Sequence, residues 1–139
     1  KFDKFKNQFE DIVKGSVGQK MFKRSFSYDI LINFSQLTIQ NIKIIRRMAP
    51  FGLGNKRPVF RTNNCFIFSK LRFLGKEEQI VKSKINDENG AQLPFICFDK
   101  KSELVDLKSS FDILYNVNLN KDLGQEAIEL SLREIFIKK

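Results

Sequence analysis

Lysine and arginine are the side chains of this sequence best suited to chemistry, since the 139-residue chain contains no histidine. Its two cysteines, Cys65 and Cys97, stand apart in apolar segments. Two isolated thiols without histidine do not make a zinc site, so we expect both to be buried and reduced. The acidic residues are scattered, with no paired-carboxylate spacing typical of acid–base catalysis. The sequence therefore predicts no catalytic residue and no metal site in this chain. Its lysines and arginines favour an anionic partner.

The positive charge is unevenly distributed along the chain. The formal net charge is +9, and residues 1–85 carry 18 Lys/Arg against 6 Asp/Glu, whereas residues 86–139 carry 7 against 10. This asymmetry favours a polyanion bound on one face. Solvated lysines without a binding role explain the charge equally well, so the charge alone leaves both interpretations open.

The strongest candidates for phosphate contact lie on two predicted strands. Lys70 and Arg72 are two residues apart in a strand predicted over residues 66–74, and Lys82 and Lys84 have the same spacing in the next strand. Alternation along a strand therefore places each pair on one face. A second basic cluster lies upstream, where the Arg57 guanidinium could bind phosphate bidentately. The candidate nucleic-acid-binding residues are Arg57, Arg61, Lys70, Arg72, Lys76, Lys82 and Lys84.

Most of the 15 phenylalanines are expected in the core, and a minority could stack on bases. Phe73 faces opposite to Arg72 on the predicted strand, and we assign it to the core. Phe51 is expected to pack between domains rather than to stack on a base.

The first half of the chain must position the upstream cluster. Phe2, Phe5, Phe9, Ile12 and Val13 recur at helical spacing and predict an amphipathic helix over residues 1–14. Alternation over residues 26–33 predicts a strand with Phe26, Tyr28, Ile30 and Ile32 on one side. A second helix is predicted over residues 36–48, capped by Ser35 or Thr38. Its apolar side consists of Leu37, Ile42, Ile44, Ile45 and Met48.

A segment rich in glycine and proline then connects this half to the next. Pro50 stops the second helix, Gly52 and Gly54 permit unusual backbone angles, and Pro58 fixes one dihedral. Phe51 and Phe60 are expected to anchor the two ends of the connection. The pattern is neither a dinucleotide-binding nor a P-loop motif.

Short strands separated by turns follow this connection. They are predicted over residues 66–74, 79–85, 93–98, 111–119 and 128–137, with a short helix over residues 101–107. This is the element order of an OB-fold, a five-stranded barrel that often binds oligonucleotides. The predicted fold class is thus α+β, with an N-terminal helix–strand–helix unit followed by a five-stranded OB-fold β-barrel.

Residues 50–60 resemble the Pro-Phe-Gly-x-Gly-Asn-Pro-x-Pro-x-Phe segment of the RecJ family of single-strand-specific DNA exonucleases. The residues that carry the resemblance are Pro50, Phe51, Gly52, Gly54, Asn55, Pro58 and Phe60. The resemblance implies that residues 1–55 are the end of the DHH-associated (DHHA1) domain with its connector, and that residues 56–139 are the OB-fold. It also implies that the Asp-His-His and Gly-Gly-His motifs, which bind Mn²⁺ or Mg²⁺ in the family, lie outside this chain.

The function implied is that of the C-terminal part of a 5′→3′ single-stranded-DNA exonuclease of DNA repair and recombination. This part would guide the strand to a distant catalytic domain and would not hydrolyse DNA by itself. The expected partner is single-stranded DNA, with a single-strand-binding protein as a further candidate, in a cytoplasmic setting and without a membrane. Two alternatives stay open: an OB-fold that docks a repair protein, and a related phosphoesterase region acting on RNA or oligonucleotides.

Overall fold

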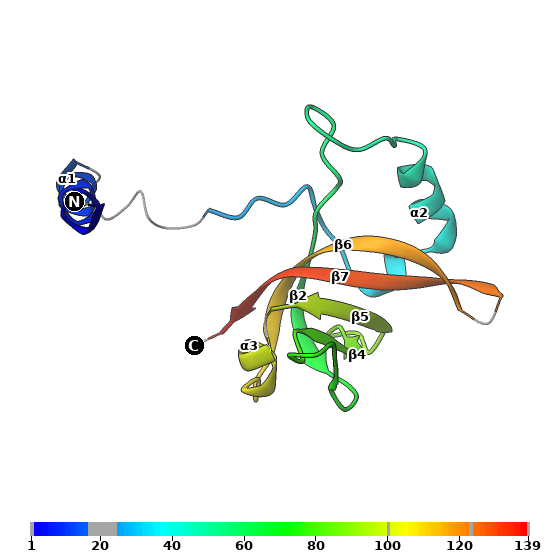
Figure 1. Ribbon diagram of the computed structural model, residues 1–139. Helices are drawn as coiled ribbons and strands as arrows, with labels where there is room; N and C mark the ends of the chain where they lie inside the picture. The colour runs from blue at the N-terminus through cyan, green and yellow to red at the C-terminus, as the bar shows by residue number, and fades with distance from the viewer. Residues whose placement is uncertain (1, 17–24, 100, 123, 139) are drawn as a thin grey trace.

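The computed structural model describes residues 2–16, 25–99, 101–122 and 124–138. Mixed α and β elements follow one another along the chain, and the strands form a single curved sheet (Figure 1). The elements are α1 (Phe2–Ser16), β1 (Ile30–Leu31), the 3₁₀ helix η2 (Phe34–Gln36), α2 (Ile39–Arg46), β2 (Phe60–Ile67), β3 (Arg72–Leu74), β4 (Ile80–Asn86), β5 (Gln92–Phe98), α3 (Lys101–Val105), β6 (Phe111–Asp122) and β7 (Gln125–Ile137).

The first predicted helix is confirmed as α1. Its Phe5 and Phe9 lie one turn apart with ring centroids 6.1 Å from each other, and both rings are exposed to solvent. The side chains of Phe2 and Val13, also predicted for this apolar stripe, lie outside the described part of the structure.

The strand predicted over residues 26–33 is mostly wrong. Only Ile30 and Leu31 form β1, which pairs in parallel with the start of β2. Phe26, Tyr28 and Ile30 are exposed rather than in the core. Alternation alone misleads here because β1 pairs only with the first two residues of β2, while the Phe26 ring meets the Phe136 ring of β7 edge-on at 5.6 Å.

The second predicted helix is shorter than its pattern. It begins at Ile39 after Thr38, whose Oγ1 accepts a hydrogen bond from the Asn41 N–H at 3.2 Å, so Thr38 rather than Ser35 is the cap. The predicted first residue, Gln36, instead ends the 3₁₀ helix η2, whose first N–H, that of Phe34, donates to the buried carboxylate of Asp87 at 2.8 Å. Leu37 and Ile42 are buried, whereas Ile44 and Met48 of the predicted apolar side are exposed.

The sheet contains seven strands rather than the predicted five. Its order is β1-β2-β6-β7-β5-β4-β3, and an additional pairing joins β2 to β4. The pairings β2–β6, β6–β7, β7–β5, β5–β4 and β4–β2 thus form a closed circuit of five strands. The short strands β1 and β3 are not part of the circuit: β1 pairs with β2, and β3 pairs with β4.

The strand predicted over residues 66–74 is divided. β2 runs over Phe60–Ile67, the chain leaves strand geometry at residues 68–71, and β3 begins at Arg72. Both parts pair with β4, but Phe66 pairs with Asn86 and Arg72 with Lys82, so the register shifts by two residues between them. At the shift, Ser69 Oγ accepts the Lys84 N–H at 3.0 Å in place of a backbone carbonyl. The remaining predicted strands and the short helix match β4, β5, α3, β6 and β7, with shifted ends.

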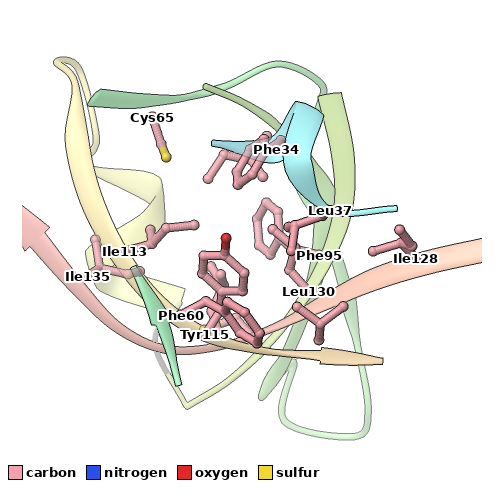
Figure 2. Packing of buried hydrophobic residues seen from close by; sticks show 14 of the residues in the cluster. Phe34, Leu37, Phe60, Cys65, Phe95, Ile113, Tyr115, Ile128, Leu130 and Ile135 are labelled. Atoms are coloured by element: carbon pink, nitrogen blue, oxygen red, sulfur yellow. The ribbon is translucent and has the colours of Figure 1, made fainter. Parts of the chain in front are cut away.

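The core fills the inside of the circuit (Figure 2). Tyr115 is packed between two other rings, with Phe60 stacked at 5.8 Å and Phe34 edge-on at 6.2 Å. Leu37 and Ile42 belong to the same cluster, so residues before the predicted boundary at 55/56 share the core of the sheet. That boundary itself stays a prediction. Phe73 packs against the cluster as expected, and both cysteines are buried free thiols.

Candidate nucleic-acid interface

Strand β4 separates a buried face from an outer basic face. Val81, Ser83 and Ile85 point into the core, whereas Lys82 and Lys84 point outward. The prediction that the two lysines share one face is confirmed, since strand alternation is local and needs no tertiary information.

Register places other polar residues in line with Lys82. Arg72 of β3 pairs with Lys82, which pairs with Ile96 of β5. Ile96 pairs with Ser131 of β7, and Ser131 pairs with Asn116 of β6. A row of outward side chains therefore crosses five neighbouring strands and begins with two cations.

The Lys82 ammonium is partly neutralised by a neighbouring carboxylate. Its Nζ lies 3.3 Å from Oε1 of Glu129 on β7, and Oε2 of the same carboxylate accepts from Asn120 Nδ2 at 2.6 Å. Arg72 and Lys84 are exposed and form no ion pair with the residues that the structure describes. These two side chains are thus the better placed to bind an anion.

Three phenylalanines lie exposed beside these cations. Phe66, Phe68 and Phe98 are 44%, 56% and 49% exposed. Phe66 pairs with Asn86, the Phe68 N–H donates to the Lys84 carbonyl at 2.9 Å, and Phe98 pairs with Ile80. We call this surface the aromatic–basic face; it consists of Phe66, Phe68, Arg72, Lys82, Lys84 and Phe98.

Sequence reasoning missed the three phenylalanines because it assigned most of this residue type to the core. A signal was present in the sequence. Phe66 and Phe68 alternate with Ile67, and Phe98 follows Cys97, so a buried assignment for Cys97 and Ile67 places the rings on the opposite side.

Lys70 and Lys76 lie outside the strands that form the aromatic–basic face. Lys70 belongs to the segment between β2 and β3, so the expectation that it shares a strand face with Arg72 is wrong. Lys76 lies in the turn after Gly75, between β3 and β4, as expected. Both side chains are exposed.

The connector is a closed loop tied to both of its neighbours. Gly52 and Asn55 exchange backbone hydrogen bonds of 2.9 and 3.2 Å, with Gly54 at a φ of 84° between them. Asn55 Nδ2 donates to the carbonyls of Met48 at 2.8 Å and Pro50 at 2.9 Å, which fixes the loop to the end of α2.

The second half of the connector is fixed to the sheet. Arg57 Nη2 donates to the Val117 carbonyl at 2.9 Å and to Asn118 Oδ1 at 2.5 Å. Asn116 Nδ2 donates to the Pro58 carbonyl at 2.6 Å, and Phe60 enters the core. Phe51 is half-buried and lines a small cavity with Ile42 and Pro58, which agrees with its expected packing role.

The part of the chain that contains the connector and most of the strand circuit matches a known family. The family model of the RecJ OB domain matches residues 28–134. The chain belongs to the RecJ OB domain family. Comparison with curated proteins gives no match. The RecJ OB match covers the connector, the strand circuit except the last three residues of β7, and every residue of the aromatic–basic face, and it leaves α1 outside.

Within the RecJ OB region, Arg61 lies in a different environment from the other predicted contacts. Its Nη2 donates to Asp112 Oδ2 at 2.9 Å and its Nε to Asn63 Oδ1 at 2.8 Å. Its guanidinium also lies over the rings of Tyr28 at 5.4 Å and Phe136 at 5.9 Å. These contacts engage Arg61 within the protein, and its role as a phosphate contact stays a prediction.

Asp112, which accepts the hydrogen bond from Arg61, is a buried carboxylate. Burial by itself raises its pKa, but hydrogen bonds from the Asn64 N–H, Arg61 and Lys138, together with the Lys138 charge, hold the pKa of Asp112 below its ordinary value. The carboxylate therefore stays ionised in the folded RecJ OB region and joins β2, β6 and the C-terminal end.

Two searches for other sites found nothing among the described residues. No group of three His, Cys, Asp or Glu side chains there could hold a metal ion. None of the helices described is both long and apolar enough to cross a membrane.

Proposed function

We propose that this chain is the single-stranded-DNA-binding C-terminal part of a RecJ-like 5′→3′ exonuclease. The observation that carries the proposal is the aromatic–basic face, where three exposed phenylalanines lie among the cations of β3 and β4. Stacking platforms beside a basic groove are what sequence-tolerant binding of single strands requires. The family match supports the parentage.

In this proposal the five-strand circuit is the OB barrel, and residues 1–55 are the end of the DHH-associated domain with its connector. Bases stack on Phe66, Phe68 and Phe98. Phosphates lie against Arg72 and Lys84, with Lys70 and Lys76 as further candidate contacts. Duplex DNA is excluded because paired bases cannot present their faces to the rings.

The chemistry of hydrolysis belongs to a domain outside this chain. In the parent enzyme, Mn²⁺ or Mg²⁺ held by the catalytic domain activates water for attack on the phosphodiester. This chain binds the single-stranded DNA and guides it toward that domain. We therefore expect the isolated chain to bind DNA and to leave it uncut.

The test is fluorescence anisotropy of a labelled oligothymidylate against the full chain, repeated with duplex DNA and RNA across a range of salt. We expect preference for single strands and a steep loss of affinity with salt. Phe68→Ala and Phe98→Ala should each weaken binding about tenfold, since one stacked base contributes about 1–3 kcal/mol. Phe5→Ala, which removes an exposed ring from α1, is the matched control and should leave affinity unchanged.

Two other outcomes would each replace this function. Binding of an acidic peptide through the aromatic–basic face, with no binding of oligonucleotide at low salt, would make the chain a docking module for a repair protein. A strong preference for RNA over DNA would indicate contacts to the 2′-hydroxyl and a related phosphoesterase with another substrate.

A further inference from the structure

A second concave surface lies between the N-terminal segment, the connector and the outer side of β6 and β7. This hollow has a volume of about 760 Å³. Residues 25–29 form one wall, residues 51–59 form the other, and the buried side chain of Leu114 lies at its floor. None of the three cations that line it belongs to the aromatic–basic face.

The two walls of the hollow are fixed to each other and to the sheet. The Asp29 N–H donates to the Val59 carbonyl at 2.8 Å, and the Val59 N–H donates to Asp29 Oδ2 at 2.8 Å. Phe26 packs against Phe136 of β7. The hollow is thus a built feature of the fold rather than a gap between unconnected segments.

Three cations line the hollow without a carboxylate partner among the described residues. They are Lys56, Arg57 and Arg133, and all three are exposed. Both hydrogen bonds of Arg57 use Nη2, so its guanidinium is oriented while no described residue accepts from Nε or Nη1. An oriented guanidinium with unused donors is suited to a phosphate.

Aromatic surface and charge balance fit the same class of ligand. The half-exposed ring of Phe26 and the half-buried ring of Phe51 line the hollow beside the cations. Two carboxylates also lie there: Asp29, which is already bonded to the Val59 N–H, and Glu134, which has a partner within the protein. The hollow therefore presents three cations and two carboxylates, with apolar ring surface for a planar group.

Two side-chain contacts and one pair of neighbouring strand positions link the hollow to the aromatic–basic face. Arg57 bonds to Asn118, and Asn118 pairs in register with Glu129. Glu129 in turn holds Lys82 of the aromatic–basic face at 3.3 Å. A polar line thus crosses β6 and β7 from one surface to the other.

We propose that the hollow is a second subsite for the same nucleic-acid strand. It takes one nucleotide beyond the aromatic–basic face, with the phosphate bound by Arg57, Arg133 and Lys56 and the base against the half-exposed ring of Phe26. The inference rests on the proposed function, because the strand reaches the hollow only if it first follows the aromatic–basic face.

The test compares two oligothymidylates on the full chain, one of about six nucleotides that covers a single OB face and one of about twenty. The double variant Lys56→Ala/Arg133→Ala should weaken binding of the longer strand about tenfold and leave the shorter one within about twofold, since only the longer strand reaches the lost cations. Lys108→Ala, an exposed cation far along the sequence, is the control and should affect neither.

An independent readout is the NMR signal of the Arg133 side-chain Nε–H. It should shift on adding the longer oligonucleotide and stay in place with the shorter one. Equal weakening of both lengths, or of neither, would overturn the subsite. Dependence of polyglutamate binding on Arg133, with oligonucleotide binding unchanged, would assign the hollow to a protein partner and also overturn it.

The design separates the two proposals. If Phe68→Ala and Phe98→Ala weaken binding and Lys56→Ala/Arg133→Ala does not, only the subsite fails. If the parent chain binds neither oligonucleotide, both proposals fail together.

Discussion

The guanidinium Nη2 of Arg61 lies 2.9 Å from Oδ2 of Asp112 and joins β2 to β6 on the outer side of the sheet. Lys138 approaches the other oxygen of the same carboxylate at 3.2 Å. Asp112 is almost fully buried, so the two cations offset the cost of removing its charge from water. Arg61, one of the predicted phosphate contacts, thus forms an ion pair within the fold. Because the pKa of Asp112 is lowered in this cluster, we expect the free energy of unfolding to depend on pH.

Asp112→Asn should lower the free energy of unfolding at neutral pH by about 1–3 kcal/mol, because Arg61 and Lys138 lose a charged acceptor. Urea unfolding followed by circular dichroism measures the change. Glu77→Gln, in the exposed turn between β3 and β4, is the comparison substitution.

The same variant should alter how stability responds to acid. The pKa of Asp112 is lower in the folded chain than in the unfolded chain. Its contribution is therefore complete above the unfolded value of about pH 4 and is lost as the pH falls through the lower folded value. Unfolding midpoints measured from about pH 6 to pH 2 should fall more steeply for the parent chain than for Asp112→Asn. Parallel curves would contradict this assignment.

Substitution of Arg61 should mainly affect stability, whereas substitution of Arg72 should mainly affect oligonucleotide binding. Arg61→Ala removes two hydrogen bonds and two ring contacts, so it should destabilise the chain by about 1–3 kcal/mol and leave oligonucleotide affinity within about twofold. Arg72→Ala should do the reverse, because its side chain is exposed and unpaired among the described residues. Thermal melts and anisotropy on the same preparations give both quantities. Equal losses of oligonucleotide affinity in the two variants would indicate that Arg61 also contacts the oligonucleotide.

Glu129→Gln should tighten binding of single-stranded DNA by about two- to fivefold at low salt. The substitution removes the negative charge 3.3 Å from Lys82 Nζ and keeps an acceptor for Asn120. Glu126→Gln provides the matched control, since Glu126 pairs with Lys43 of α2 instead. A gain of the same size in both variants would indicate a general charge effect rather than release of Lys82.

A buried hydroxyl pair predicts an asymmetry between two conservative substitutions. Thr62 Oγ1 donates to the Ile32 carbonyl at 2.6 Å, so Tyr115 must donate its hydroxyl hydrogen to Thr62 at 2.8 Å. Thr62→Val should cost about 2–4 kcal/mol, because it leaves two buried polar groups without a partner. Tyr115→Phe removes only the donor and should cost about 1 kcal/mol. Denaturant titrations of both variants would test this order.

The element types of α1, α2 and the strands of the second half could be predicted from the sequence, because helix and strand periodicity reflects side-chain direction within a few residues. Thr38 as a helix cap and the shared face of Lys82 and Lys84 are of this local kind. The resemblance of the connector motif likewise pointed to the RecJ family, and the RecJ OB match over residues 28–134 agrees with it.

Tertiary pairing decided the rest. The residues from Phe66 to Leu74 read as one strand, yet they divide because their two ends pair with β4 in registers that differ by two residues. Arg61 and Arg72 are alike in sequence terms, and only the positions of Asp112, Tyr28 and Phe136 make one of them a structural cation. Assembly of the hollow also depends on which distant segments meet. Such contacts join residues far apart in the chain, so no local pattern records them.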